Sequence, residues 1–240
     1  MVTASSKTLT HVIGLGFNCE VDFKIHKYYK GAQSYAYTWC LVGNRKLFID
    51  SLSNLDHLLD GPHSPYKRGL ETFNRYQISF HLRESLLTTA VPSEQAMPEL
   101  FSRETHLIEK TKGIFQDSKA HLIFLQTVQA QSFETDRNYT NEVADVLSKI
   151  CASSQITVFF IFEGNKVNQK QYRSLEQGII KIRFVRHFSE PKDRGDLWGW
   201  LRILKETGKG QTLRFIYSDS PFLCWLFKPL VQLAHHLKKH

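Results

Sequence analysis

The amino-acid sequence predicts an α/β protein, a Rossmann-like three-layer sandwich around a mostly parallel sheet. From residue 120 on, near-continuous apolar segments alternate with amphipathic helical ones, which is typical of a parallel sheet covered on both faces. Before them, residues 10–19 have the pattern of a strand, a glycine turn and a helix start, where open α/β sheets usually bind a ligand.

The first predicted strand is apolar at positions 12, 13 and 15 and contains Gly14 and Gly16. Both glycines permit a positive φ and a close approach of a ligand to the backbone. The segment nearly matches the dinucleotide fingerprint, but Cys19 replaces its third glycine and residues 33–42 hold no acid for the ribose. We therefore expect no NAD site, which leaves an anion or nucleotide-phosphate site, a reactive cysteine, or a plain connecting turn.

Asn18 and Cys19 open a helix that is expected to run to about residue 30. Asn18 suits the N-cap, and Cys19 falls in the first turn, where free N–H groups favour an anion and lower the pKa of a thiol. A nucleophilic Cys19 needs a base, and His187 is best placed because it follows a predicted strand and should share the same sheet edge. Alternatively, His187 is only a surface histidine in a loop. The other candidate bases are His81 and His121.

The remaining elements follow from periodicity and turn signals. In chain order they are a strand or ordered loop at 31–39, a helix at 46–59, a strand at 76–82, a helix at 93–115, a strand at 120–128, a helix at 138–151, a strand at 155–162, a helix at 168–177, a strand at 179–185, a helix at 196–206 and a short strand at 213–216. Without an internal repeat or a linker, residues 1–220 are predicted to form a single α/β domain.

Composition limits the partners and the compartment. A formal net charge of +8 and a pI of about 9.3 indicate an anionic partner. Nucleic acid is not expected, because zinc-finger, RNP and concentrated basic-helix patterns are absent. Four cysteines without a C-x-x-C pair, and an N-terminus without an apolar core, predict reduced thiols in a cytoplasmic protein. We expect Cys40, Cys151 and Cys224 to be core residues.

Basic residues flank His187 and are candidates for holding a diphosphate. Arg186 and Arg194 are the pair that we expect to neutralise it, with Arg183 and Lys192 nearby; a solvated charged loop is the alternative. The chain has no D-x-D, H-x-H or H-E-x-x-H pattern, so no metal site is predicted.

Residues 221–240 combine aromatic and aliphatic bulk with a basic end. Lys228 and Pro229 interrupt the segment, which is too short to span a bilayer. We expect this amphipathic basic segment to lie at an anionic membrane surface, at the inner membrane; the alternative is a terminal helix packed on the sheet.

Three stretches together resemble the DUF1796 family, whose members are labelled papain-like cysteine peptidases and also occur as domains of cell-surface glycan synthesis enzymes. They are residues 13–19, similar to the opening S-L-G-x-x-C element, residues 34–39, similar to S-Y-P-F-D-W, and the tryptophan-bearing helix around Trp198. Ala36 and Thr38 replace the proline and the aspartate of the second element. The resemblance implies either a peptidase or a glycan transferase, and places Trp39 among the substrate contacts.

These observations together favour a transferase of cell-surface polysaccharide biosynthesis. We expect a metal-independent glycosyltransferase with a nucleotide-sugar donor and a glycan or lipid-linked acceptor, needing no other cofactor. Its phosphate would lie at Gly14, Gly16 and Asn18, and His187 or a nearby acid would act as the base. The alternatives are an acyltransferase or esterase acting on glycans, a cysteine peptidase with Cys19 as nucleophile, and a non-enzymatic binding module.

Overall fold

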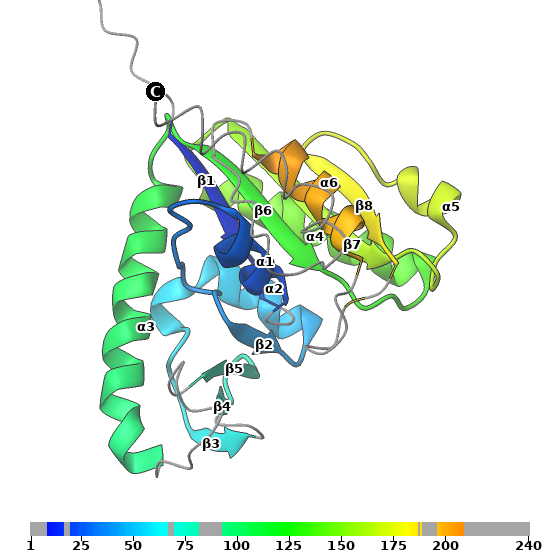
Figure 1. Ribbon diagram of the computed structural model, residues 1–240. Coiled ribbons are helices and arrows are strands. Elements are labelled where there is room, and N and C mark those ends of the chain that lie inside the picture. The colour runs from blue at the N-terminus through cyan, green and yellow to red at the C-terminus, as the bar shows by residue number, and fades with distance from the viewer. Residues whose placement is uncertain are drawn as a thin grey trace, which may run out of the picture.

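The computed structural model describes residues 9–16, 20–66, 70–81, 93–186, 188 and 196–208. Its larger sheet has four parallel strands in the order β1-β6-β7-β8 (Figure 1). The strands are β1 (Thr10–Gly14), β6 (His121–Thr127), β7 (Gln155–Glu163) and β8 (Ile180–Val185). Three of them match the apolar segments predicted at 120–128, 155–162 and 179–185, and the prediction of an α/β fold with a parallel sheet is confirmed.

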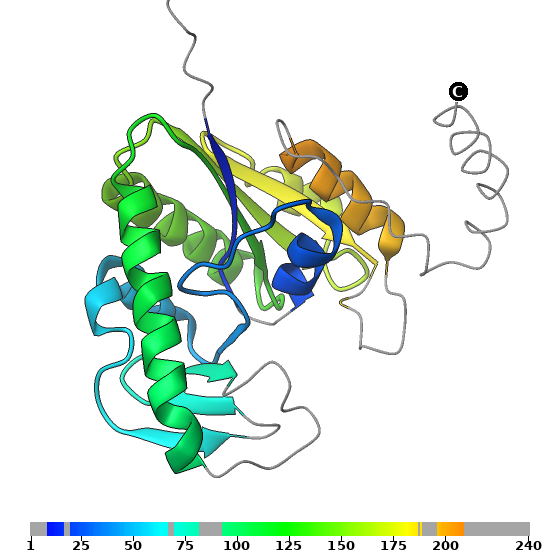
Figure 2. The same ribbon diagram turned by 60° about the vertical axis from the view of Figure 1, so that its left-hand side comes forward.

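Helices cover both faces of this sheet (Figures 1 and 2). They are α1 (Glu20–Tyr28), α2 (Arg45–Ser53) with the 3-10 turn η1 (Leu55–His57), α3 (Ser93–Phe115), α4 (Phe133–Ile150), α5 (Gln169–Arg173) and α6 (Leu197–Thr207). The predicted helix at 138–151 begins earlier, because Ser132 Oγ accepts the N–H of Thr135 and caps α4 at its first turn.

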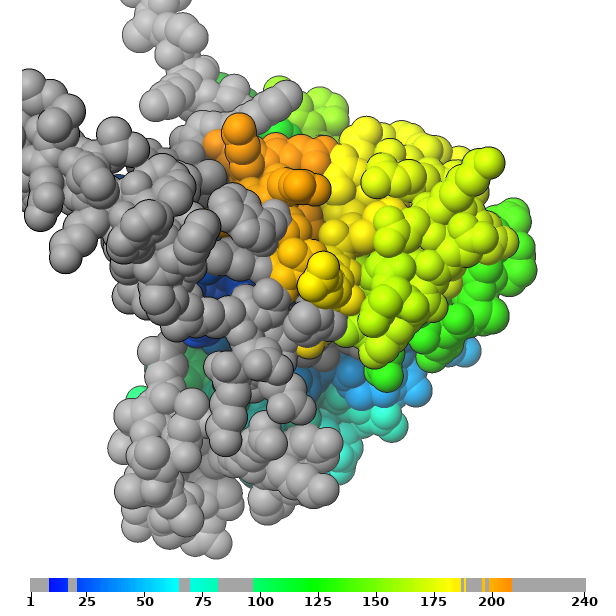
Figure 3. Space-filling view, turned by 45° about the vertical axis from the view of Figure 1, so that its right-hand side comes forward, coloured from blue at the N-terminus to red at the C-terminus, as the bar shows by residue number. Residues whose placement is uncertain are grey.

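Each face of the sheet has its own apolar core, because alternate strand residues point to opposite sides. On one face, Val12, Ile123 and Ile161 pack with α1 and α6. On the other face, the alternate strand residues pack with α2, α3, α4 and α5. Helix α6 lies directly against β8 (Figure 3). Its Trp200 is fully buried in the core that α1 and α6 cover.

The strand predicted at 76–82 is confirmed as part of a second, antiparallel sheet, which itself was not predicted. Its order is β2-β5-β4-β3, and its strands are β2 (Cys40–Val42), β5 (Ile78–His81), β4 (Leu70–Phe73) and β3 (His63–Tyr66). Helix α3 runs beside both sheets (Figures 1 and 2): Phe115 contacts Phe124 of β6, and Phe101 contacts Phe73 of β4. The small sheet is thereby attached to the same body as the parallel one.

Some predictions fall on residues that are not described, namely the strand at 213–216 and the basic segment 221–240. Residues 31–39 form an ordered loop with a turn rather than a strand. Among the helices of the described residues, none combines the length and the apolar character needed to cross a bilayer.

Candidate functional site

The chain leaves two neighbouring strands of the parallel sheet in opposite directions. After β1 it enters α1 on one face, and after β6 it enters α4 on the other face. The two strands are paired up to this point, where Leu15 N donates to Leu125 O at 2.9 Å. In open α/β sheets, ligands bind in the crevice outside such a divergence, at the carboxyl ends of the strands.

A hollow of about 470 Å³ lies at this edge of the sheet. Its wall comes from the end of β2, the first turn of α2, the loop after β6 and the first turn of α4. The lining residues are Val42, Gly43, Asn44, Arg45, Lys46, Gln129, Gln131 and Thr135. The hollow adjoins the glycine turn, because a Cβ placed on Gly16 would lie 3.4 Å from Val42 Cγ2.

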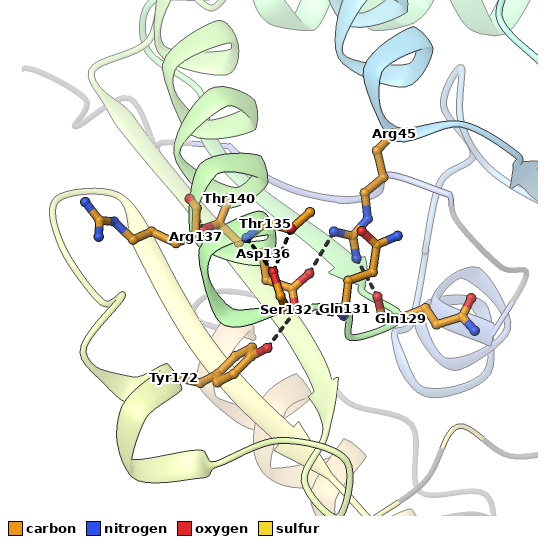
Figure 4. A network of polar contacts seen from close by, with 9 residues as sticks. All are labelled: Arg45, Gln129, Gln131, Ser132, Thr135, Asp136, Arg137, Thr140 and Tyr172. Atoms are coloured by element: carbon orange, nitrogen blue, oxygen red, sulfur yellow. Dashed lines mark hydrogen bonds and ion pairs between the residues drawn. The ribbon is translucent and has the colours of Figure 1, made fainter.

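Arg45 reaches from α2 across the hollow to the carboxylate of Asp136 on α4 (Figure 4). Arg45 Nη1 lies 2.7 Å from Asp136 Oδ1, and Arg45 Nη2 donates to the carbonyl of Gln129. Asp136 is fully buried and also accepts hydrogen bonds from Tyr172 Oη at 2.7 Å and from Gln131 N at 3.0 Å. The carboxylate is therefore neutralised and saturated within the protein, as a buried charge must be.

Several buried polar atoms beside this pair have no hydrogen bond of good geometry. The guanidinium of Arg45 lies 4.7 Å from the ring centre of Tyr139, and its Nε is buried without a partner. Tyr139 Oη is also buried without a hydrogen bond of good geometry, and so are both side-chain polar atoms of Gln126, which lies next to Tyr139. Burial raises the pKa of Tyr139. Each such group costs about 1–3 kcal/mol unless a water molecule or a ligand satisfies it.

The two predicted glycines pack against the protein itself. Gly16 has a φ of +68°, and a Cβ there would collide with Cys40 Sγ. A Cβ on Gly14 would collide with the carboxylate of Asp22. On that side of each glycine the space is filled by the protein, whereas the sequence had suggested an open approach for a ligand.

Asp22 is an acid at this edge that sequence reasoning missed. It is only 1% exposed, and its Oδ2 accepts the N–H of Trp39 at 3.0 Å. Burial raises the pKa of this carboxyl from 3.8 to about 7, with the Trp39 hydrogen bond opposing the shift. Trp39 has a left-handed φ of 62°, and its ring lies 5.7 Å from that of His26. A local signal existed, because Asp22 shares the apolar face of α1 with Ile25, three residues further on.

The other predicted residues are distributed along the fold. Arg186 follows β8, the far edge strand, and three strand spacings of about 4.8 Å place it roughly 14 Å from the glycine turn. Arg183 forms ion pairs with Glu176 and Glu206. His121 pairs with Thr10 at the amino end of the sheet, away from the glycine turn.

Four candidates, Asn18, Cys19, His187 and Arg194, lie outside the described residues. His81 ends β5 in the antiparallel sheet. Cys40 and Cys151 are buried in the core, as predicted. Within the part of the chain that the structure describes, no three His, Cys, Asp or Glu side chains are grouped so that they could hold a metal ion. No protein-family model, curated protein or solved structure matches this chain.

Proposed function

We propose that this protein is a transferase that binds a phosphate-bearing donor where β1 and β6 diverge. The observation that carries the proposal is the hollow at this divergence, because open α/β proteins place their ligands there. In the form favoured by the sequence, the protein is a Rossmann-like glycosyltransferase of cell-surface polysaccharide synthesis that uses a nucleotide sugar.

The lining of the hollow supports this ligand class. Among the described lining residues are two cations, three carboxamides and one hydroxyl, and none is a carboxylate. Cations offset the charge that develops on a departing nucleoside diphosphate, while carboxamides and hydroxyls can bond sugar hydroxyls in either direction. A nucleotide sugar presents both kinds of group in one molecule.

A transfer reaction also needs a group that accepts the proton of the acceptor hydroxyl. His187 was predicted for this role and lies outside the described residues. Asp22 is a described acid at the same edge, but it is only 1% exposed and does not line the hollow, so in this proposal it is not the base. In this proposal the acceptor is a glycan or a lipid-linked glycan, and residues 221–240 hold the enzyme at an anionic inner-membrane surface.

The test is release of nucleoside diphosphate by the full-length chain from a panel of nucleotide sugars, with and without polyprenyl-linked acceptors. We expect release from at least one donor, slower release in Lys46→Gln, and unchanged release in Lys149→Gln, an exposed lysine near the other end of α4. Failure of every nucleotide sugar to bind or react would refute the proposal.

Cys19→Ser distinguishes the alternatives, because acyl transfer or peptide cleavage through a thiol cannot survive loss of its nucleophile. We expect the variant to keep substantial release of nucleoside diphosphate. Complete loss of turnover with intact donor binding would favour the cysteine-dependent alternatives.

A further inference from the structure

We propose that the hollow contains an oxyanion subsite, formed by Arg45 and Lys46 at the start of α2, that takes the diphosphate of the ligand. The subsite deepens the proposed function, and it differs from the phosphate contacts predicted from sequence at the glycine turn and at Arg186 and Arg194. Its chemistry follows from the groups that line the hollow.

The start of α2 offers hydrogen-bond donors to a ligand in the hollow. The N–H groups of Arg45 and Lys46 occupy the first two positions of α2 and have no intrahelical acceptor. Those of Leu47 and Phe48 are already bonded to Asn44. The guanidinium of Arg45 adds N–H donors to the same wall, because it has about five N–H groups and its Nη atoms use two of them on Asp136 and Gln129. The oxygens of an oxyanion accept hydrogen bonds from such N–H groups, and the helix dipole adds to the attraction.

The charges around the hollow also favour an anion. Asp136 compensates Arg45 and is itself saturated, so it offers no free carboxylate oxygen to repel an anion. Glu134, in the first turn of α4, lies 3.3 Å from Arg137 Nη1. Lys46 is exposed and adds a positive charge to the lining of the hollow. The described wall thus has a net positive charge, with polar amides around it.

Arg45 is already held in place. Its two Nη atoms are held by Asp136 and Gln129 (Figure 4). Its Cζ lies 4.7 Å from the ring centre of Tyr139. A side chain that is fixed before the ligand arrives loses little conformational entropy on binding. Gln131 lines the same hollow as Arg45, so a substitution at 131 changes the lining of the subsite.

The test is calorimetric titration of the full-length chain with pyrophosphate at constant ionic strength. Gln131→Glu places a carboxylate in the hollow and should weaken binding about tenfold or more, and Lys46→Gln should weaken it about fivefold. The matched controls are Gln116→Glu and Lys149→Gln, both at exposed positions outside the hollow, and each should bind as wild type does. Thermal melts of all five proteins confirm that they are folded.

Absence of pyrophosphate binding to the wild type overturns the subsite, and so does equal binding by all five proteins. Two further ligands, a nucleoside diphosphate and a polyprenyl diphosphate in micelles, show whether the donor or a lipid carrier supplies the diphosphate. Tighter binding of either than of pyrophosphate, lost in Gln131→Glu, supports the subsite. If pyrophosphate binds as expected but no nucleotide sugar reacts, the subsite stands and the transferase proposal falls. If a nucleotide sugar reacts but pyrophosphate does not bind, the transferase proposal stands and this subsite falls.

Discussion

Replacing Asp22 by asparagine should make the protein more stable at alkaline pH than the wild type. The carboxyl is buried, and no charged group among the described residues contributes to its pKa shift. Folding raises its pKa from 3.8 to about 7. At one pH unit per 1.36 kcal/mol, that difference corresponds to about 4 kcal/mol of stability lost when both states are ionised.

The sign follows from which state holds the proton. Well below pH 3.8 both the folded and the unfolded carboxyl are protonated, and the raised pKa costs nothing. Between about pH 4 and 7 the unfolded chain is ionised while the folded chain keeps its proton, so stability falls as the pH rises. Above pH 7 the whole penalty is present. The asparagine variant does not titrate and is free of this penalty.

The assay is urea unfolding of both proteins at several pH values between 4 and 8. The amide introduced by Asp22→Asn has its own burial cost, about 1–3 kcal/mol, but that cost does not depend on pH. The free energy of unfolding of Asp22→Asn relative to the wild type should therefore increase by about 4 kcal/mol across this range. Asp145→Asn, an exposed acid on α4, is the matched control and should show no comparable change. A difference that stays constant with pH would refute the reasoning.

Three further outcomes are expected. Gly16→Ala should lower the free energy of unfolding by about 3 kcal/mol, because Gly16 has a positive φ and the space beside it is filled. Gly31 also has a positive φ but open space beside it, so Gly31→Ala should cost only about 1 kcal/mol in the same urea assay. Arg45→Met should cost about 3–5 kcal/mol, because it leaves Asp136 buried and unpaired; a cost below 1 kcal/mol would contradict the role of this pair. Cys19→Ser should keep most of the nucleoside diphosphate release measured by coupled assay, and loss of it would point to thiol chemistry.

The parallel sheet could be predicted because its central strands are buried on both faces. The strand at 155–163 is apolar at six of its nine positions, and all but the first residue of the strand at 121–127 are buried. The edge strand at 180–185 carries Lys181 and Arg183 between apolar residues. The antiparallel sheet could not be predicted in the same way. Its strands have three or four residues each, and Pro65 lies within its edge strand β3, where a missing N–H is tolerated.

The candidate site was predicted only in part. The predicted glycine turn lies at the sheet edge that the hollow adjoins, and it could be recognised because a strand, two glycines and a helix start are a local pattern. Arg45 and Asp136 are 91 positions apart, and only the tertiary fold brings them together. Asp22 was missed because a single acid in an amphipathic helix is usually solvated, whereas here it faces the sheet beside Gly14.

The most direct test of the account is a crystal structure of the full-length protein soaked with nucleotide sugars. The account predicts density for the diphosphate in the hollow, within hydrogen-bond distance of Arg45 and Lys46 and beside the loop at 129–131. Density for the same ligand at the amino end of the sheet, or on the antiparallel sheet with the hollow empty, would contradict it.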